Sequence, residues 1–379
     1  MHTHGSHDGD LSEIRLAGFG GGTRLLGSRD NLRWATEFFS PALRSMSQAA
    51  TTETVHAEID SQRHLELHRR MHRGQTRRYN CFTLDGHFES FSGCASADGG
   101  LVIWLDTLSL MLCVNEARDV FHVIADSPEA KLRVGVMRVL REIATVRALR
   151  SGALPLHGAA CVVSGVAVGF LGAKRAGKTT SLIHWLQTPR TRFLANDRFF
   201  VFHRDAAWFA QGMPTIVSVR TDTLRHFEAL RRRLGDLPYR PSRTLAEVRS
   251  GRVQPTEPGD SVYLSQAQFL EITDRSAEIE APVGILLFPE RDDRLGNAEF
   301  ESLPTLEGMN LLRSSLLSPG PRLATAEVFD REPRFEVSEE AVRETCHKLA
   351  ASGFCHRYRQ GVRTLASPAT MPWDGSVSH

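Results

Sequence analysis

The stretch Val166-Ala-Val-Gly-Phe-Leu-Gly-Ala-Lys-Arg-Ala-Gly-Lys-Thr-Thr180 decides the fold that we predict. Its first six residues are apolar or small, which is typical of a buried strand. The next eight match the pattern G-x-x-x-x-G-K-[ST] at every required position, and Ser181-Leu-Ile-His-Trp-Leu186 has helical periodicity. A strand, this loop and a helix in that order predict a phosphate-binding loop in an α/β domain.

Each residue type in the loop has a physical reason to bind a nucleoside triphosphate. Glycines let backbone N–H groups curl round a phosphate, Lys178 can reach the β- and γ-phosphates, and the Thr179 hydroxyl can hold Mg²⁺. A guanine-specific [NT]-K-x-D segment is absent, which favours adenine or a non-selective site. We therefore expect ATP and Mg²⁺ on the loop residues Gly172, Ala173, Lys174, Arg175, Ala176, Gly177, Lys178, Thr179 and Thr180.

A polar break, Asn196-Asp197-Arg198, interrupts the otherwise apolar residues 193–202, which we predict to be the next strand. A strand that follows the loop helix is often parallel and adjacent to the loop strand, so Asp197 can arrive beside the phosphates. There it can hold Mg²⁺ or accept a proton, and Asn196 and Arg198 are candidate contacts to substrate or phosphate. The alternative is a turn or bulge in which Asp197 only caps backbone groups.

His157 opens the strand that precedes the loop strand. If the two strands pair across the turn Ser164-Gly165, equal steps from the turn carry His157 to the level of Gly172. We expect it to orient Asp197 or a substrate oxygen there; a purely structural histidine is the alternative.

These residues together resemble the HPr kinase/phosphorylase-like family of serine kinases, over residues 154–202 and more loosely to 290. The matching pieces stand in the family's order and spacing: His157-Gly158, Ser164-Gly165, Gly172–Thr179 and Asn196-Asp197-Arg198. The resemblance implies a phosphoenolpyruvate-carboxykinase-like α/β core with ATP and Mg²⁺. It also implies that Asp197 is the general base, with His157, Lys178 and Thr179 in the family's matching positions.

The chain departs from the family at several places. Asn196 replaces the first Asp of the family's pair, and Arg175 stands where many members have a glycine. A Glu-Ile-Arg-Gly-type segment is missing, and residues 211–217 are its nearest substitute. We therefore expect a hydroxyl on a peptide, protein or small biosynthetic molecule as acceptor rather than HPr itself. A nucleotide-hydrolysing regulatory or scaffold module is the alternative.

Composition sets the outer limits. Among 379 residues, 46 Lys and Arg against 44 Asp and Glu give a net charge of +2, and 41% of residues are hydrophobic. This balance argues against nucleic acid as the main partner. Six cysteines without a CxxC pair fit a reducing compartment, and no apolar run is long enough for a membrane span. We expect a cytoplasmic protein, and the family resemblance favours a homo-oligomer.

We expect four regions along the chain: a flexible segment 1–25, an α+β domain 26–150, the phosphate-loop core 151–310 and a C-terminal extension 311–379. In the second region we predict a helix at 28–50, a hairpin around Asp85-Gly86, strands at 101–105, 109–114 and 120–124, and a helix from Pro128 to 150. Residues 235–261 read as a surface loop.

Three weaker groups of residues are open to two interpretations. His64, His68 and His72 would share one face of a helix, either as a solvated or basic surface or as part of a metal site. Cys346-His347 and Cys355-His356 offer zinc ligand types without a known spacing. The basic run from Arg225 to Arg243 is either solvated or helps to neutralise phosphate.

Overall fold

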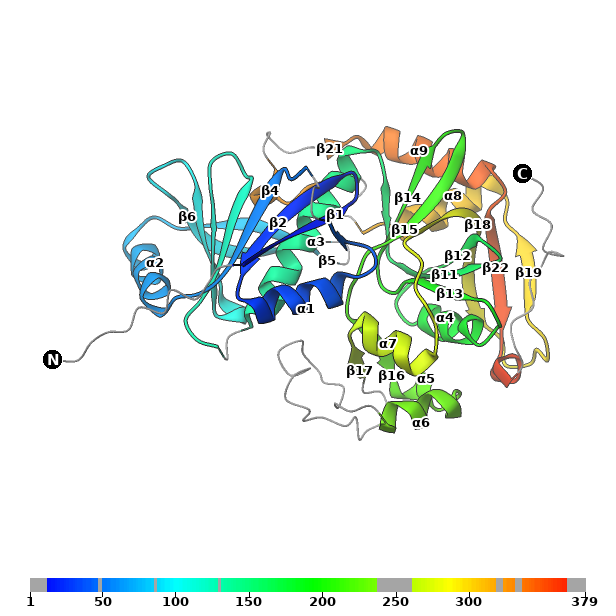
Figure 1. The fold of residues 1–379 in the computed structure, drawn as a ribbon. Coiled ribbons are helices and arrows are strands. Elements are labelled where there is room, and N and C mark those ends of the chain that lie inside the picture. The colour runs from blue at the N-terminus through cyan, green and yellow to red at the C-terminus, as the bar shows by residue number, and fades with distance from the viewer. Residues whose placement is uncertain are drawn as a thin grey trace. The chain divides into compact units, whose positions relative to one another are not determined.

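The computed structural model describes residues 12–46, 50–84, 87–128, 131–236, 261–317, 323–330 and 336–366. The chain is a mixed α/β protein that divides into two compact units (Figure 1). Unit 1 comprises Met1–Phe82, Phe88–Arg147 and Thr325–Phe335, and unit 2 comprises Thr83–His87, Ala148–Ala324 and Glu336–His379. None of the helices described is both long and apolar enough to cross a membrane.

The first sheet has nine strands in the order β3-β1-β2-β4-β9-β8-β7-β6-β5. Its strands are β1 (Ser12–Gly18), β2 (Gly21–Gly27), β3 (Arg44–Ser45), β4 (Glu53–Ile59), β5 (Arg77–Leu84), β6 (His87–Ala95), β7 (Leu101–Leu105), β8 (Leu110–Val114) and β9 (Val120–Ala125). The helices are α1 (Arg29–Phe39), α2 (Ser61–Arg73) and α3 (Leu132–Arg150).

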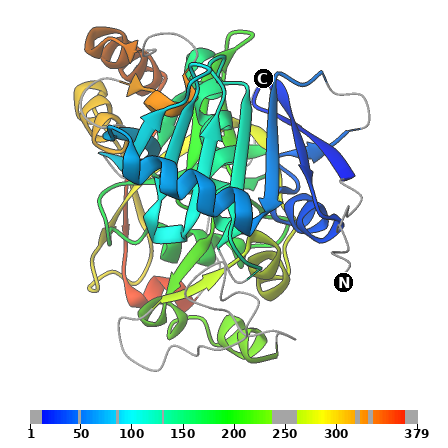
Figure 2. The ribbon, with the colours of Figure 1, turned by 90° about the vertical axis from the view of Figure 1, so that its left-hand side faces the viewer.

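Helices cover both faces of this sheet. Helix α2 crosses one face, where Met71 packs with Met111 and Ile124 of the sheet (Figure 2). On the opposite face Gly135 of α3 lies close to Leu110 and Val123, where even a Cβ would come within 2.5 Å of the Leu110 side chain. Helix packing on both faces explains why the central strands carry apolar residues at successive positions rather than at alternate ones.

Three predictions for this region are wrong, and the others that fall on described residues are confirmed. Helix α1 buries Leu32, Ala35, Phe38 and Phe39 and has Ser28 as its N-cap, but it ends at Phe39 and not at residue 50, and β3 follows. Pro41 disfavours a helical backbone at Ser40, which is extended. The flexible segment predicted up to residue 25 is instead the hairpin β1–β2, and residues 1–11 lie outside the described ranges. Helix α3 begins at Leu132, so the predicted start at Pro128 is wrong. The predicted turn Asp85-Gly86 lies outside the described residues.

The second sheet also has nine strands, seven of them in the order β10-β14-β15-β18-β12-β11-β13, and β22 links β18 to β19. Its strands are β10 (Leu154–Leu156), β11 (Gly158–Val163), β12 (Val166–Leu171), β13 (Arg192–Ala195), β14 (Phe199–Arg204), β15 (Ala207–Gly212), β18 (Glu280–Arg291), β19 (Glu299–Ser302) and β22 (Cys355–Gln360). Outside it lie two short ribbons, β16 (Val217–Arg220) with β17 (Ser261–Leu264) and β20 (Leu323–Ala324) with β21 (Glu336–Val337). The helices are α4 (Lys178–Leu186), α5 (Thr221–Leu224), α6 (Glu228–Asp236), α7 (Gln266–Thr273), α8 (Thr305–Ser314) and α9 (Glu339–Ala351).

Strand β18 organises this sheet because it pairs with three different strands along its length. It pairs antiparallel with β15, then parallel with β12, and finally parallel with β22. All six residues of β12 are buried, and so is Trp185 of α4 above them. Each such large apolar side chain contributes about 1.5–3 kcal/mol on burial, so the loop that follows β12 is held on a rigid base.

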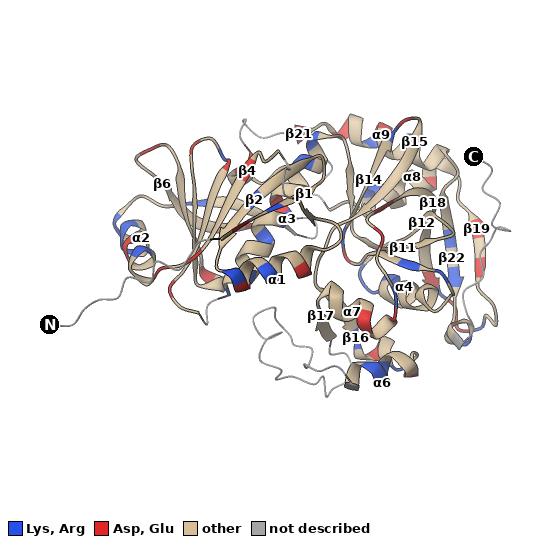
Figure 3. Ribbon diagram, viewed as in Figure 1, with Lys and Arg blue, Asp and Glu red and all other residues tan. Residues whose placement is uncertain are grey.

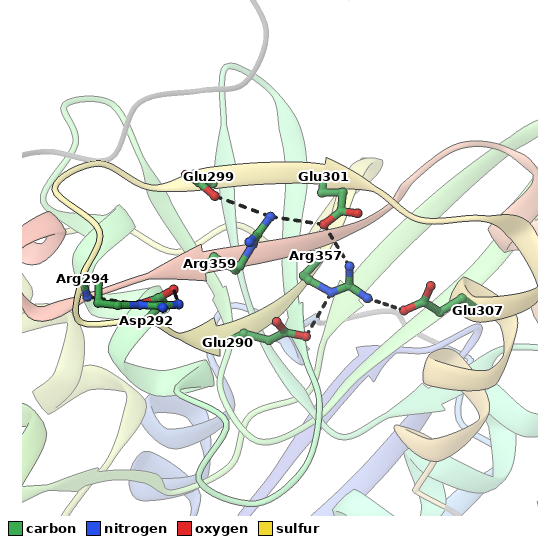
Figure 4. Close-up of polar contacts among 8 residues, drawn as sticks. All are labelled: Glu290, Asp292, Arg294, Glu299, Glu301, Glu307, Arg357 and Arg359. Carbon is green, nitrogen blue, oxygen red and sulfur yellow. Dashed lines mark hydrogen bonds and ion pairs between the residues drawn. The ribbon is translucent and has the colours of Figure 1, made fainter.

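The C-terminal region, expected as a separate extension, supplies β22 and α9 to unit 2. An ion-pair network joins β22 to its neighbours: Arg357 lies 3.1 Å from Glu290, 2.9 Å from Glu301 and 2.5 Å from Glu307 (Figure 4). Arg359 reaches Glu299 and Glu301 at 3.5 and 3.4 Å. Figure 3 shows basic residues on β22 beside acidic residues on β19. The network ties β18, β19, β22 and α8 together.

Replacing Arg357 tests this network. We expect Arg357→Ala to lower the melting temperature by about 2–4 °C, because one change leaves three carboxylates without their shared cation. Arg294 is the matched control, since among the residues described it forms an ion pair with Asp292 alone and its side chain is 89% exposed. Arg294→Ala should leave the melting temperature unchanged in thermal denaturation followed by circular dichroism. Equal effects of the two substitutions would contradict a specific role for Arg357.

Candidate functional site

The hairpin β11–β12 places His157 beside the loop. Gly158 pairs with Leu171 and Val163 with Val166, so the turn is Ser164-Gly165, as predicted. His157 directly precedes β11 and Gly172 directly follows β12, so both lie one residue beyond the last pair of this register.

The loop between β12 and α4 has the backbone of a tight curl. Gly172 and Gly177 have φ values of 131° and 94°, and Arg175 also has a positive φ of 71°. The Lys178 ammonium donates to the carbonyl oxygens of Gly172 and Ala173 at 2.8 and 3.0 Å. The predicted order of strand, loop and helix is therefore confirmed.

Two interruptions of β-strands lie next to each other beside this loop. Strands β10 and β11 are interrupted at His157, and strands β13 and β14 are interrupted at Asn196–Arg198. Because β14 pairs with β10 and β13 pairs with β11, the two interruptions face each other. The backbone N–H of Gly158 donates to the Asp197 carbonyl at 3.3 Å, and Asp197 has a positive φ of 75°. This left-handed residue ends β13 and redirects the chain to β14.

The prediction of one strand over residues 193–202 is therefore wrong. Residues 192–195 and 199–204 are two strands at different places in the sheet. The expected adjacency to the loop strand is also wrong, because β13 pairs with β11 and not with β12. Asp197 still lines the same cavity as the loop. It is placed there by the connection between β13 and β14 and not by a parallel strand beside β12.

Side chains from the two breaks meet side chains of the loop. The Thr179 hydroxyl donates to Asn196 Oδ1 at 3.1 Å, and His157 Nε2 lies 3.6 Å from Asp197 Oδ1. Asn196 is buried, whereas the Asp197 side chain is 43% exposed. Asn196 is thus a structural partner of the loop, and Asp197 is accessible from solvent.

Arg198 does not serve as the sequence predicted. It is 2% exposed, and its guanidinium donates to the backbone carbonyl of Thr83 at 3.0 Å. The residues that line the cavity beside the loop do not include Arg198.

These groups line a cavity of about 700 Å³, a size that suits a small-molecule ligand. Loop residues 174–180, His157, Asn196 and Asp197 form one wall, and the ends of β18 and β22 form another. The third wall comes from β16, β17 and α5, where Thr223 bonds the Thr180 hydroxyl at 3.1 Å. Asp293 also lines the cavity, and a hydrogen bond from Arg291 lowers its pKa, which keeps this carboxylate ionised at neutral pH.

The sequence analysis missed the contribution of β22 to this cavity. Gln360 ends β22, lines the cavity and donates to the buried Ser181 hydroxyl of α4 at 2.5 Å. Its amide oxygen is buried and has no hydrogen-bond partner. Gln360 lies 360 − 178 = 182 positions after Lys178. Only the pairing of β22 with β18 brings it to the loop.

The weaker groups have structural explanations. His64, His68 and His72 share one face of α2, as predicted, and the first two rings pack on Trp104 at 5.5 and 5.0 Å. Cys346 and Cys355 are buried, which raises the pKa of each thiol to about 12. In the basic run, Arg231 and Arg232 pair with Glu228 rather than line the cavity, while Arg240 and Arg243 lie outside the described residues.

No protein-family model matches this chain, and no curated protein matches it significantly. The protein is a mixed α/β protein in which a glycine-containing loop between β12 and α4 lines a cavity together with a carboxylate and an imidazole.

Arg175 offers a test of the loop's backbone. A left-handed conformation costs a residue other than glycine about 1–2 kcal/mol, whereas glycine adds about 0.4–1 kcal/mol of chain freedom to the unfolded state. We expect Arg175→Gly to raise the free energy of unfolding by about 0.5–1 kcal/mol in urea denaturation. Lys174 is the matched control, because it is an exposed neighbour without a positive φ, and Lys174→Gly should destabilise the protein. Destabilisation by both changes would argue against strain at Arg175.

Proposed function

We propose that this protein is an ATP-dependent kinase that phosphorylates a hydroxyl group on a peptide, a protein or a small biosynthetic molecule. One observation carries the proposal. The Asp197 carboxylate lines the same cavity as the predicted phosphate-binding loop, and the His157 imidazole lies 3.6 Å from it. A base beside a phosphate-binding loop is what transfer to a hydroxyl requires.

The loop fits the triphosphate of a nucleotide. Backbone N–H groups at the start of α4 and the ammonium groups of Lys174 and Lys178 offer positive charge to an anion. The Lys178 ammonium now bonds loop carbonyls, and it would exchange these bonds for phosphate oxygens. The resemblance to the HPr kinase-like family points to ATP, and the absence of a guanine-specific segment agrees with it.

The residues next to the loop also fit Mg²⁺. The Thr179 hydroxyl and the Asn196 amide oxygen are 3.1 Å apart, and both are the hard oxygen ligands that Mg²⁺ prefers. Asp197 is the candidate carboxylate ligand beside them. When bound, Mg²⁺ would neutralise charge that develops on the phosphoryl group. Asn196 adds no negative charge, so we expect this chain to depend more on Lys178 than a relative with two carboxylates would.

Asp197 is the residue that we assign to proton transfer. Its carboxylate is partly exposed, so an acceptor hydroxyl can approach it. His157 also lines the cavity, is 23% exposed in its side chain, and restricts the orientations that Asp197 can adopt. Asp197 would take the proton of the hydroxyl as the new oxygen–phosphorus bond forms, a role worth about 10²–10⁴ in rate.

Replacing Asp197 tests the assignment. We expect Asp197→Asn to lower phosphoryl transfer at least about 100-fold and to leave ATP affinity within a few fold, because the amide keeps the shape but accepts no proton. Asp205 is a matched control: it also has a positive φ, 49°, but its side chain is 91% exposed and it does not line the cavity. Asp205→Asn should retain full transfer. Near-normal transfer by Asp197→Asn would remove Asp197 from this role.

Labelled nucleotide separates a kinase from a hydrolytic switch. We expect γ-labelled ATP, incubated with the protein and extract fractionated by size, to transfer its label to a peptide or metabolite. Lys178→Ala should abolish the transfer. Release of free phosphate alone, at the same rate with and without extract, would instead support the regulatory module.

A further inference from the structure

Two histidines and a glutamate that do not line the cavity meet on the first sheet. Strands β4 and β9 run parallel, and His56 is directly opposite His122 in their register. Their rings are stacked, with centroids 4.3 Å apart and planes inclined by 16°. Glu58 follows His56 by two positions and therefore lies on the same face of the sheet. Three metal-ligating side chains thus come from two neighbouring strands of unit 1.

The ligand atoms of the three side chains lie within 4.8 Å of one another. Glu58 Oε1 lies 2.6 Å from His122 Nδ1, a hydrogen-bonding distance, and 3.9 Å from His56 Nδ1. Ligand atoms on a tetrahedral zinc ion, at about 2.0–2.1 Å from the metal, are about 3.3 Å apart. A bound ion would therefore replace the hydrogen bond between His122 and Glu58, with the first distance about 0.7 Å longer and the second about 0.6 Å shorter. Within the described ranges, no other group of three His, Cys, Asp or Glu residues places its ligand atoms within 4.8 Å of one another.

Arg63 holds the carboxylate in the orientation that such a site needs. Its guanidinium donates from α2 to Glu58 Oε2 at 2.5 Å, which leaves Oε1 directed at the two imidazoles. Carboxylates that bind metals are commonly oriented by a hydrogen bond of this kind from outside the ligand set. The three side chains are 20–26% exposed, so an ion can enter from solvent.

The chemistry of the three side chains suits a transition-metal ion. Two imidazoles and one carboxylate form a zinc-type ligand set with a fourth position left for water.

We propose that His56, Glu58 and His122 bind one divalent transition-metal ion of the zinc class on the α2 face of the first sheet. Imidazole ligands favour this class over Mg²⁺ and Ca²⁺, which take oxygen ligands. The positive charges of Arg24 and Arg63 also act on His56, so the affinity is lower than that of thiolate-rich zinc sites. This site is independent of the proposed kinase activity.

Zinc titration of the full chain tests the proposal. We expect one equivalent of Zn²⁺, measured by competition with a chromophoric chelator, to be lost from Glu58→Gln and from His122→Gln. Each affinity should fall at least about 100-fold, because each substitution removes one of three ligands. Excess Mg²⁺ should not compete. Zn²⁺ should also raise the melting temperature of the unsubstituted protein and not that of Glu58→Gln.

Two controls separate this site from other residues that could bind zinc. Cys113 is the cross-strand partner of His122 on β8, and His68 belongs to the histidine face of α2. Cys113→Ser and His68→Gln should keep the full affinity. His2, His4 and His7 are present in every variant, so any zinc that they hold is the same throughout. Circular dichroism without metal checks that each variant folds. Equal zinc binding by a folded Glu58→Gln variant, or an equal loss in either control, would overturn the proposal.

Discussion

The candidate site depends on one constraint, the coincidence of two breaks in paired strands. A regular antiparallel pair would satisfy its backbone hydrogen bonds internally and would direct alternate side chains to the two faces of the sheet. Here the chain is interrupted between β10 and β11 and also between β13 and β14. The two interruptions face each other, because β14 pairs with β10 and β13 pairs with β11. The hydrogen bond from Gly158 N–H to the Asp197 carbonyl closes the gap. His157 and Asp197 lie outside the regular strands, and their side chains line the same cavity as the loop that follows β12.

The parts that the sequence could predict are those with local signals. The loop, its strand and its helix were predictable from residues 166–186, and the turn Ser164-Gly165 placed His157 because a hairpin register follows from its turn. The break at Asn196–Arg198 was recognised, but its direction was not, because a single left-handed aspartate decides it. Gln360 had no signal at all, because β22 reaches the loop only through its pairing with the middle strand β18.

The histidine–glutamate cluster is a second group of residues that the sequence alone could not bring together. His56 and Glu58 alternate along a strand, as many exposed pairs do, and nothing local connects them with His122, 122 − 56 = 66 positions later. Only the parallel pairing of β4 with β9, which no turn determines, places the two rings together. In the more conspicuous pattern, histidines at every fourth position of α2, His64 and His68 pack on Trp104 and His72 packs on His68. Residues that lie close in the sequence are therefore a poor guide to ligand sets on parallel strands.

The path of the chain has a consequence for how the protein is made. Residues 325–330 belong to unit 1, where Phe329 stacks on Phe121 with ring centroids 5.1 Å apart. Unit 1 therefore lacks part of its interior until the ribosome has passed residue 330, although most of it is synthesised first. The two units are interleaved in synthesis, and a nascent chain cut near residue 150 would leave neither of them whole. Chaperones and proteases would meet an N-terminal unit that stays incomplete for most of translation.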